Sequence, residues 1–267
     1  MMDIAAHASR RSDRYGLRDV VRSEWTKLAS LRSSRWTLVA FALTGVTLGV
    51  AISAVSASLW PTASAETRAH WDPTNNTLAG LIPGYLVIPV LGVLMMTSEY
   101  TSGSVRSTFA AVPRRPLVLA AKSIVFGGAV LATVEVITFV TFLAGQAVMG
   151  SAPHATIGQP GVLRALLLSG AFLVLMGLFG LGLGVIVRRS AAAVALYAAI
   201  ALVAPMILSA FPGNLWRFGP IMILGNSVGA VRLLPGVLSP WVGFGVMTLY
   251  TVVSLAVGAV LLTRRDV

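Results

Sequence analysis

The stretch WTLVAFALTGVTLGVAISAVSASL, residues Trp36 to Leu59, contains 24 residues and no acidic or basic side chain. A helix of about 20 such residues crosses the roughly 30 Å of hydrocarbon in a bilayer. Five further apolar runs follow along the chain: Leu78 to Ser98, Ser123 to Val148, Ala165 to Val187, Ala191 to Phe211 and Trp241 to Leu262. The sequence therefore predicts an all-α integral membrane fold with six transmembrane helices.

The composition excludes water as the main solvent of this chain. Of its 267 residues, 56% are hydrophobic and 11% are charged, whereas about 25% charged residues are usual in soluble domains. The net charge of +11 could indicate nucleic acid, but the basic residues lie between apolar runs and form no stripe, so we expect no nucleic-acid partner. The absence of cysteine excludes disulfides and thiolate chemistry.

The basic residues predict the orientation. Sixteen of the 20 Lys and Arg residues lie in segments that a six-span topology places on one side of the membrane. Cytoplasmic segments retain positive charge during insertion, so we expect both termini in the cytoplasm. The predicted parts are a cytoplasmic N-terminal segment (1–35), a six-span domain (36–262) and a cytoplasmic tail (263–267). Phe218 to Val231 is too short for a seventh span, and we interpret it as interfacial or re-entrant between spans five and six.

An amphipathic helix is predicted before the first span. Its apolar residues cover about 140° of arc at helical spacing; they are Leu17, Val20, Val21, Trp25, Leu28 and Leu31. Such a helix would lie on the inner leaflet of the bilayer, with its basic face attracted to anionic lipid. Glu24 projects into the apolar arc, so it needs a partner such as Lys27 or another cytoplasmic basic residue, unless it simply reaches water.

The connection after the second span, SEYTSGSVRSTFAAVPRRPLVLAAK (98–122), carries the most informative pattern. Glu99 ends the span, Gly103 follows four residues later, and a short helix leads to Pro113, Arg114 and Arg115 before Lys122 opens the next span. Glu24, Trp25 and Lys27 precede the first span. In this pattern and in its six-span layout, the chain resembles the permease subunits of type-2 ATP-binding cassette (ABC) exporters, particularly those of an actinobacterial type.

The resemblance implies that residues 101–112 form a coupling helix that docks into a separate ATPase subunit, beside the N-terminal helix. The residues implied in coupling are Glu99, Gly103, Val105, Arg106, Phe109, Pro113, Arg114, Arg115 and Lys122, with Glu24, Trp25 and Lys27 on the N-terminal helix. It also implies a bacterial plasma membrane and a working unit of two permeases, either a homodimer or a heterodimer, with two ATPases. The alternative is an ordinary positive-inside loop whose arginines only set the topology.

The chain contains no G-x-x-x-x-G-K-[ST] motif, and its two lysines, Lys27 and Lys122, follow no Gly-rich loop. We therefore expect no enzymatic activity, no directly bound cofactor, and ATP and Mg²⁺ on the partner subunit. His70 and Asp72 are too few ligands to predict a metal site.

Glu135 is the one ionisable residue deep inside a predicted span. A charged, lipid-facing carboxylate would cost about 2.5 to 3.5 kcal/mol, so Glu135 should face the bundle interior. It serves either the substrate pathway, as a polar or proton-binding group, or a structural hydrogen bond. If it couples to ions, the chain is instead a self-sufficient secondary transporter or channel. A third alternative is a membrane anchor or immunity protein without transport. The composition of the chain does not identify a transported substrate.

Overall fold

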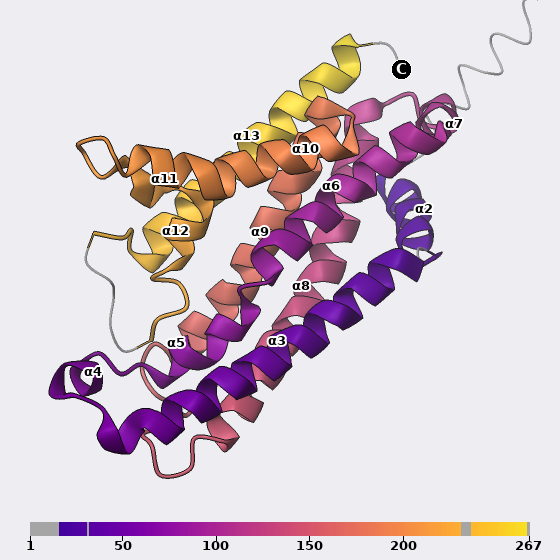
Figure 1. The fold of residues 1–267 in the computed structure, drawn as a ribbon. Coiled ribbons are helices and arrows are strands. Elements are labelled where there is room, and N and C mark those ends of the chain that lie inside the picture. Colours follow the sequence, from indigo (N-terminus) through magenta and orange to yellow (C-terminus); the bar gives the residue numbers. More distant parts are fainter. Residues whose placement is uncertain (1–15, 31, 231–235, 266–267) are drawn as a thin grey trace, which may run out of the picture.

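The computed structural model of the chain describes residues 16–30, 32–230 and 236–265. Over these ranges the chain is helical and has no strand, and six helical segments are long and apolar enough to cross a membrane, as predicted. They consist of α3 (Arg32–Leu59), α6 (Gly84–Ser102) preceded by α5 (Pro73–Leu78), α8 (Arg115–Ala147), α9 (Val162–Val187), α10 (Ser190–Ala198) continued to α11 (Ala204–Leu208), and α13 (Pro240–Arg264) (Figure 1).

Helices α6 and α9 form the centre of the bundle. Of the most apolar 18 residues in each span, 61% are buried in the second span and 72% in the fourth. Only 22% are buried in the first and in the fifth. The two central helices touch through their backbones, because a Cβ atom on Gly92 would overlap the carbonyl of Gly177. A Cβ atom on Gly180 would likewise overlap Pro89. The close spacing of glycines in α9 therefore serves packing inside the chain.

The outer helices direct large apolar side chains away from the bundle. Trp36 on α3, Val136 on α8 and Trp241 on α13 are each more than 60% exposed, and Met206 on α11 is 77% exposed. Monomeric soluble proteins rarely expose apolar surface of this extent, whereas hydrocarbon solvates it well. The exposed surface of the helices thus agrees with the length and composition of the six spans.

One end of the bundle is strongly basic. Helices α2 (Leu17–Ser30) and α7 (Ser104–Ala111) lie there, close to the C-terminal end of α13 (Figure 1). We call it the basic end because it carries Arg18, Arg22, Lys27, Arg32, Arg35, Arg106, Arg114, Arg115, Lys122, Arg188, Arg189, Arg264 and Arg265. The opposite end, the far end, carries α4 (Ala65–Ala69) and α5. Residues 1–15 of the predicted N-terminal segment and 266–267 of the predicted tail lie outside the described residues.

Several helix boundaries differ from the predicted ones. The second span is broken near Pro83, which precedes α6, and the fifth ends at Leu208 rather than Phe211. A π-helical turn, Ala199–Val203, precedes Pro205 in the fifth span. Proline has no N–H to donate and its ring crowds the preceding turn, so the helix rearranges there. The third helix begins at Arg115, so Lys122 lies two turns inside it.

The segment predicted to be re-entrant folds as a short helix, α12 (Pro220–Leu224), followed by turns up to Ala230. Val231, its predicted last residue, lies outside the described residues. The far end holds the segment in place: the Arg164 guanidinium donates to the Gly229 carbonyl (2.7 Å), and the Asp72 carboxylate accepts from the Ala230 N–H (2.8 Å). The same carboxylate caps α5. A re-entrant position in the membrane stays a prediction.

Helix α2 is amphipathic, but its buried line differs from the predicted arc. Val20 and Glu24 are buried at 4% and 1% exposure, whereas Leu17 and Trp25 are 42% and 53% exposed. Leu31, the last residue of the predicted arc, lies outside the described residues. Helix α2 therefore packs against its neighbours with a face that carries both Val20 and Glu24. The face that carries Leu17 and Trp25 stays exposed.

Candidate functional site

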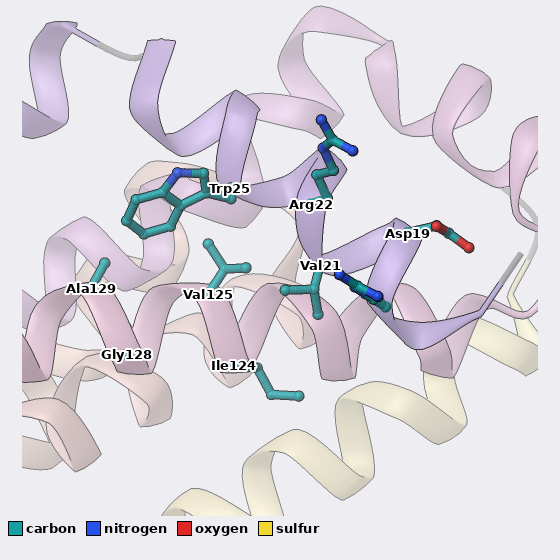
Figure 2. Close-up of a pocket in the computed structure, with 9 residues that line it drawn as sticks. Asp19, Val21, Arg22, Trp25, Ile124, Val125, Gly128 and Ala129 are labelled. Atoms are coloured by element: carbon teal, nitrogen blue, oxygen red, sulfur yellow. The ribbon is translucent and has the colours of Figure 1, made fainter.

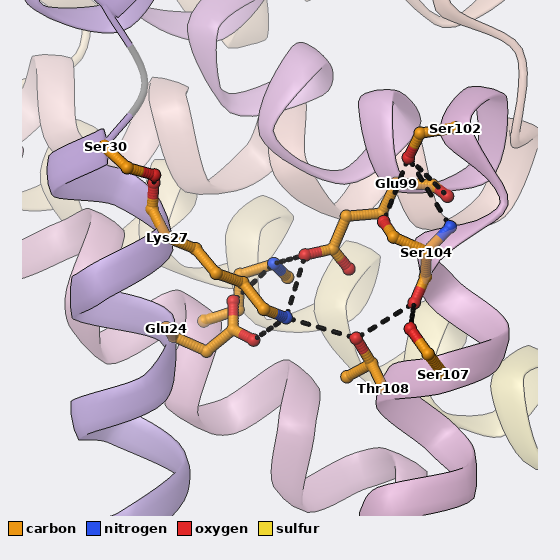
Figure 3. A network of polar contacts seen from close by, with 9 residues as sticks. Glu24, Lys27, Ser30, Glu99, Ser102, Ser104, Ser107 and Thr108 are labelled. Carbon is orange, nitrogen blue, oxygen red and sulfur yellow. Dashed lines mark hydrogen bonds and ion pairs between the residues drawn. The ribbon is translucent and has the colours of Figure 1, made fainter.

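Four charged side chains from three helices form a closed network at the basic end (Figure 3). Lys122 Nζ on α8 donates to Glu24 Oε2 on α2 (2.5 Å) and to Glu99 Oε1 on α6 (2.8 Å). Lys27 Nζ on α2 donates to Glu24 Oε1 (2.6 Å) and to the same Glu99 oxygen (3.2 Å). Each lysine thus bridges both carboxylates. We call these four residues the charge network.

The local sequence explains how these groups meet. Glu24 and Lys27 are three residues apart on α2, which places them on the same helical face. Glu99 stands one turn before the end of α6, and Lys122 lies on a buried face of α8. Glu24 is in the position that the sequence identified as needing a basic partner, and it has two such partners, Lys27 and Lys122.

Burial makes the charge network energetically demanding. The side chains of Glu24 and Lys122 are 1% and 2% exposed, and that of Glu99 is 12% exposed. Ions taken out of water lose several kcal/mol of solvation each, and good pairing must offset this loss. Removing one partner would leave an uncompensated buried charge. The network therefore ties α2, α6 and α8 into one unit.

Lys27 is the accessible member of the charge network, with 37% of its side chain exposed. Burial alone would lower the pKa of Lys27, but the hydrogen bond and charge of Glu24, with the charge of Glu99, outweigh it and raise that pKa above 10.5. Its ammonium also donates to Thr108 Oγ1 on α7 (3.2 Å). Lys27 therefore extends the network to the short helix after the second span.

Helix α7 is joined to α6 through one residue in the left-handed conformation, Gly103, with φ of 73°. Other residues adopt this conformation at an energetic cost, so the glycine is suited to the sharp joint. Val105 and Phe109 are buried at 3% and 9% exposure and seat the helix on the bundle. The helix ends at Ala111, because the residue before Pro113 is pushed into an extended conformation.

The short helix divides the predicted coupling residues into two groups. Val105 and Phe109 face the chain's own core, so they hold α7 in place and offer no surface to a partner. Arg106, Pro113 and Arg114 are exposed. The exposed side of α7 is therefore mostly polar, formed by Arg106 with Ser104, Ser107 and Ala110.

Arg115 connects the start of α8 to the last span. Its guanidinium donates to the carbonyls of Leu262 (2.7 Å) and Arg265 (2.9 Å), at the C-terminal end of α13. It also lies over the Phe109 ring, 5.3 Å from the ring centre. The sequence pattern gave no sign of the two carbonyl contacts, because they join residues 147 and 150 positions apart.

Trp25 and Glu135 lie apart from the charge network. Trp25 is exposed on another face of α2, in the groove shown in Figure 2. Glu135 lies in the middle of α8, where a Cβ atom on Gly170 of α9 would overlap its carboxylate. Its Oε2 is buried and has no hydrogen-bond partner within the described ranges. The predicted interior position of Glu135 is therefore confirmed in part, since the side chain is half-buried between α8 and α9.

A narrow groove of about 330 Å³ separates α2 from α7. Asp19, Ser23 and Lys27 line it on one side, and Ser107, Thr108 and Ala111 on the other. Polar groups from both helices thus converge at the surface directly above the charge network. The sequence did not predict this groove, because the relative placement of α2 and α7 depends on contacts distant in sequence.

The six helices define the class of this chain: by length and composition they are those of a multi-pass membrane protein. No known family model matches the chain, and no curated protein is significantly similar to it. The more specific assignment therefore depends on the residues at the basic end.

Proposed function

We propose that this chain is the membrane-spanning permease subunit of an ABC exporter, coupled to a separate ATPase. The observation that carries the proposal is the charge network, which ties the N-terminal helix and the exposed short helix to the inner ends of two spans. Glu24, Lys27, Glu99 and Lys122 are also residues in which the sequence resembles type-2 ABC exporters. Their convergence gives that resemblance a physical role.

In this proposal, α7 receives the force of the ATPase on its exposed side, at Arg106 and Ser107. Val105 and Phe109 pass the displacement to the core, and Thr108 passes it to Lys27. Since Lys27 and Lys122 both contact Glu99, α6 and α8 then move together with α2. Interfaces of packed helices have few stable arrangements, so a small shift at one end favours a switch between two states of the pathway.

The partner contact would include the groove between α2 and α7. Its rim carries Asp19, Ser23 and Ser107, which can fix the orientation of a docked segment by hydrogen bonds and charge. The basic end then faces the cytoplasm, where ATP and Mg²⁺ are bound by the partner. Two copies of the permease, or one with a related chain, complete the pathway in the plasma membrane.

Co-expression with a candidate ATPase subunit tests the proposal. We expect the two chains to co-purify and the chain to change ATP turnover by the ATPase in membranes. R106E, on the exposed side of α7, should weaken both effects at least tenfold. R35E, an equal charge change at the start of α3, should leave them intact. If no complex forms with the wild-type chain, the proposal fails.

The second candidate, a self-sufficient ion-coupled transporter or channel, is favoured by one observation. Glu135 keeps a buried carboxylate oxygen without a hydrogen-bond partner in the described part of α8 and its neighbours, and such intramembrane carboxylates often bind ions or protons. The purified chain would then move a solute along an ion gradient in liposomes without nucleotide. E135Q would abolish that movement while preserving the fold.

A further inference from the structure

A larger groove, of about 780 Å³, lies between α2 and α8 (Figure 2). Its α2 wall includes Arg18, Val21, Arg22 and Trp25, which follow helical spacing on one face, and Asp19 at its edge. At 100° per residue, this face lies opposite the one that carries Lys27 and the α7 groove. The groove is thus separate from the charge network, and nothing in the proposed coupling mechanism uses it.

The wall on α2 is basic and solvent-facing. Arg18 and Arg22 are one helical turn apart and exposed, and neither guanidinium makes an ion pair or hydrogen bond within the described residues. Asp19 also borders the groove, and its carboxylate accepts from the Gly16 N–H at the start of α2 (3.2 Å). Two cations against one anion leave the wall net positive. It therefore attracts an anionic group.

The floor on α8 is apolar and open. Ile124 is 52% exposed, and a Cβ atom on Gly128 would meet no atom within 4 Å. Val125 and Ala129 complete the floor, which leads from the basic wall onto the apolar surface of the bundle. A soluble anion would use only the arginines. A molecule with an anionic head and a hydrocarbon tail would use both surfaces.

We propose that this groove binds an anionic glycerophospholipid of the leaflet at the basic end. The phosphate lies against Arg18 and Arg22, and one acyl chain follows Ile124 and Gly128 along α8. The exposed indole of Trp25 sits at the boundary between head and tail, where amphipathic rings are favoured. The site would fix α2 to the bilayer, and it requires no particular transport mechanism.

The test counts lipids bound to the purified full-length chain by native mass spectrometry in detergent. The probes are phosphatidylglycerol and phosphatidylcholine with identical acyl chains. Each basic residue near an anionic lipid contributes about a fivefold factor, so we expect the wild type to prefer phosphatidylglycerol by roughly 30-fold. R18Q/R22Q should lose this preference. R32Q/R35Q, which removes the same charge at the start of α3, should retain it.

A second pair of variants tests the floor without altering charge. G128L should fill the track and reduce phosphatidylglycerol binding about tenfold, whereas G245L, at an equally open glycine of α13, should have no effect. If R18Q/R22Q fails to fold, the comparison of G128L with G245L still tests whether the groove binds the lipid. The proposal would be overturned if the wild type bound both lipids equally. It would also be overturned if G128L bound phosphatidylglycerol as well as the wild type does. Competition by glycerol phosphate at matched concentration would reveal a site for soluble phosphate and overturn it as well.

Discussion

Lys122 is the residue on which the charge network depends most. Its ammonium lies between two carboxylates with 2% of the side chain exposed. A lysine at this depth is stable only because the pairing compensates its lost hydration. Its neighbour Glu24 is equally buried and depends on the same contact.

We expect K122M to lower the free energy of unfolding by about 3–5 kcal/mol, because it leaves the Glu24 carboxylate buried with a single partner. Denaturant unfolding in detergent micelles measures this loss. The double variant E24Q/K122M serves as the control: it removes both charges and should recover much of the stability. If the two single losses simply add in the double variant, the side chains are not coupled and the account of the network is wrong.

Lys27 predicts a pH dependence of stability. The pKa of Lys27 is raised in the folded chain, so its charge stabilises the fold fully below pH 10.5, and this contribution is lost as the pH rises through the raised pKa. Thermal unfolding at pH 9 to 12 follows the loss. K27R stays charged over that range and should flatten the alkaline decline. If K27R loses thermal stability over the same pH range as the wild type, groups other than Lys27 cause the alkaline loss.

The contact between Gly170 and Glu135 predicts a coupled pair of substitutions. G170A should destabilise the fold by about 0.5–1.5 kcal/mol, because the added Cβ atom overlaps the Glu135 carboxylate and forces that side chain into another rotamer. In an E135A background the same substitution should cost little. Denaturant unfolding of the wild type, G170A, E135A and the double variant measures the two costs. An equal cost of G170A in both backgrounds would contradict the packing described.

At the scale of elements, the joint between α6 and α7 determines how the exposed short helix is held. We expect G103A to cost about 1 kcal/mol, since alanine is strained in the left-handed conformation. The measurable effect is faster hydrogen exchange in α7, together with lower ATP turnover by a bound partner. G245A in α13, where a Cβ atom meets nothing, is the control. Unchanged exchange in G103A would show that the joint does not hold α7.

The sequence predicted the spans well because each needs only a long apolar run. The resemblance implied a short helix over residues 101–112 after the second span, whereas α7 spans Ser104–Ala111 and residues 101 and 102 still belong to α6. The sequence could not predict which side of that helix faces the core: the resemblance implied Val105 and Phe109 in coupling to an ATPase, yet both are buried in the chain itself. Helical spacing defines a face, and only the neighbouring helices determine where that face points.

The charge network was predictable in part. Glu24 interrupts an apolar arc, which signals a need for a basic partner, and Lys27 is near in sequence. The contact with Lys122 spans 98 positions, and only the packing of α2 on α8 reveals it. The groove between α2 and α8 was hidden from the sequence for the same reason. Arg18 and Arg22 are visible as a basic face, while the floor on α8 depends on how the two helices lie together.

At the scale of the whole molecule, the fold has a tightly packed centre and two ends that differ in charge and in the contacts that hold them. The far end is held by backbone contacts such as that of Asp72 with Ala230. The basic end concentrates ion pairs and two grooves. This asymmetry agrees with the charge pattern of the sequence, and in the proposed function it distinguishes the driven end from the end that opens outward.

The central claim is that a partner ATPase drives this chain through α7. The chain has no cysteine, so S107C on the exposed side of α7 and A65C on α4 each introduce a single thiol. ATP turnover by the co-purified ATPase is measured before and after labelling with a bulky maleimide. We predict that labelling S107C lowers turnover at least fivefold and that labelling A65C leaves it unchanged. Equal turnover after labelling both variants would contradict the claim.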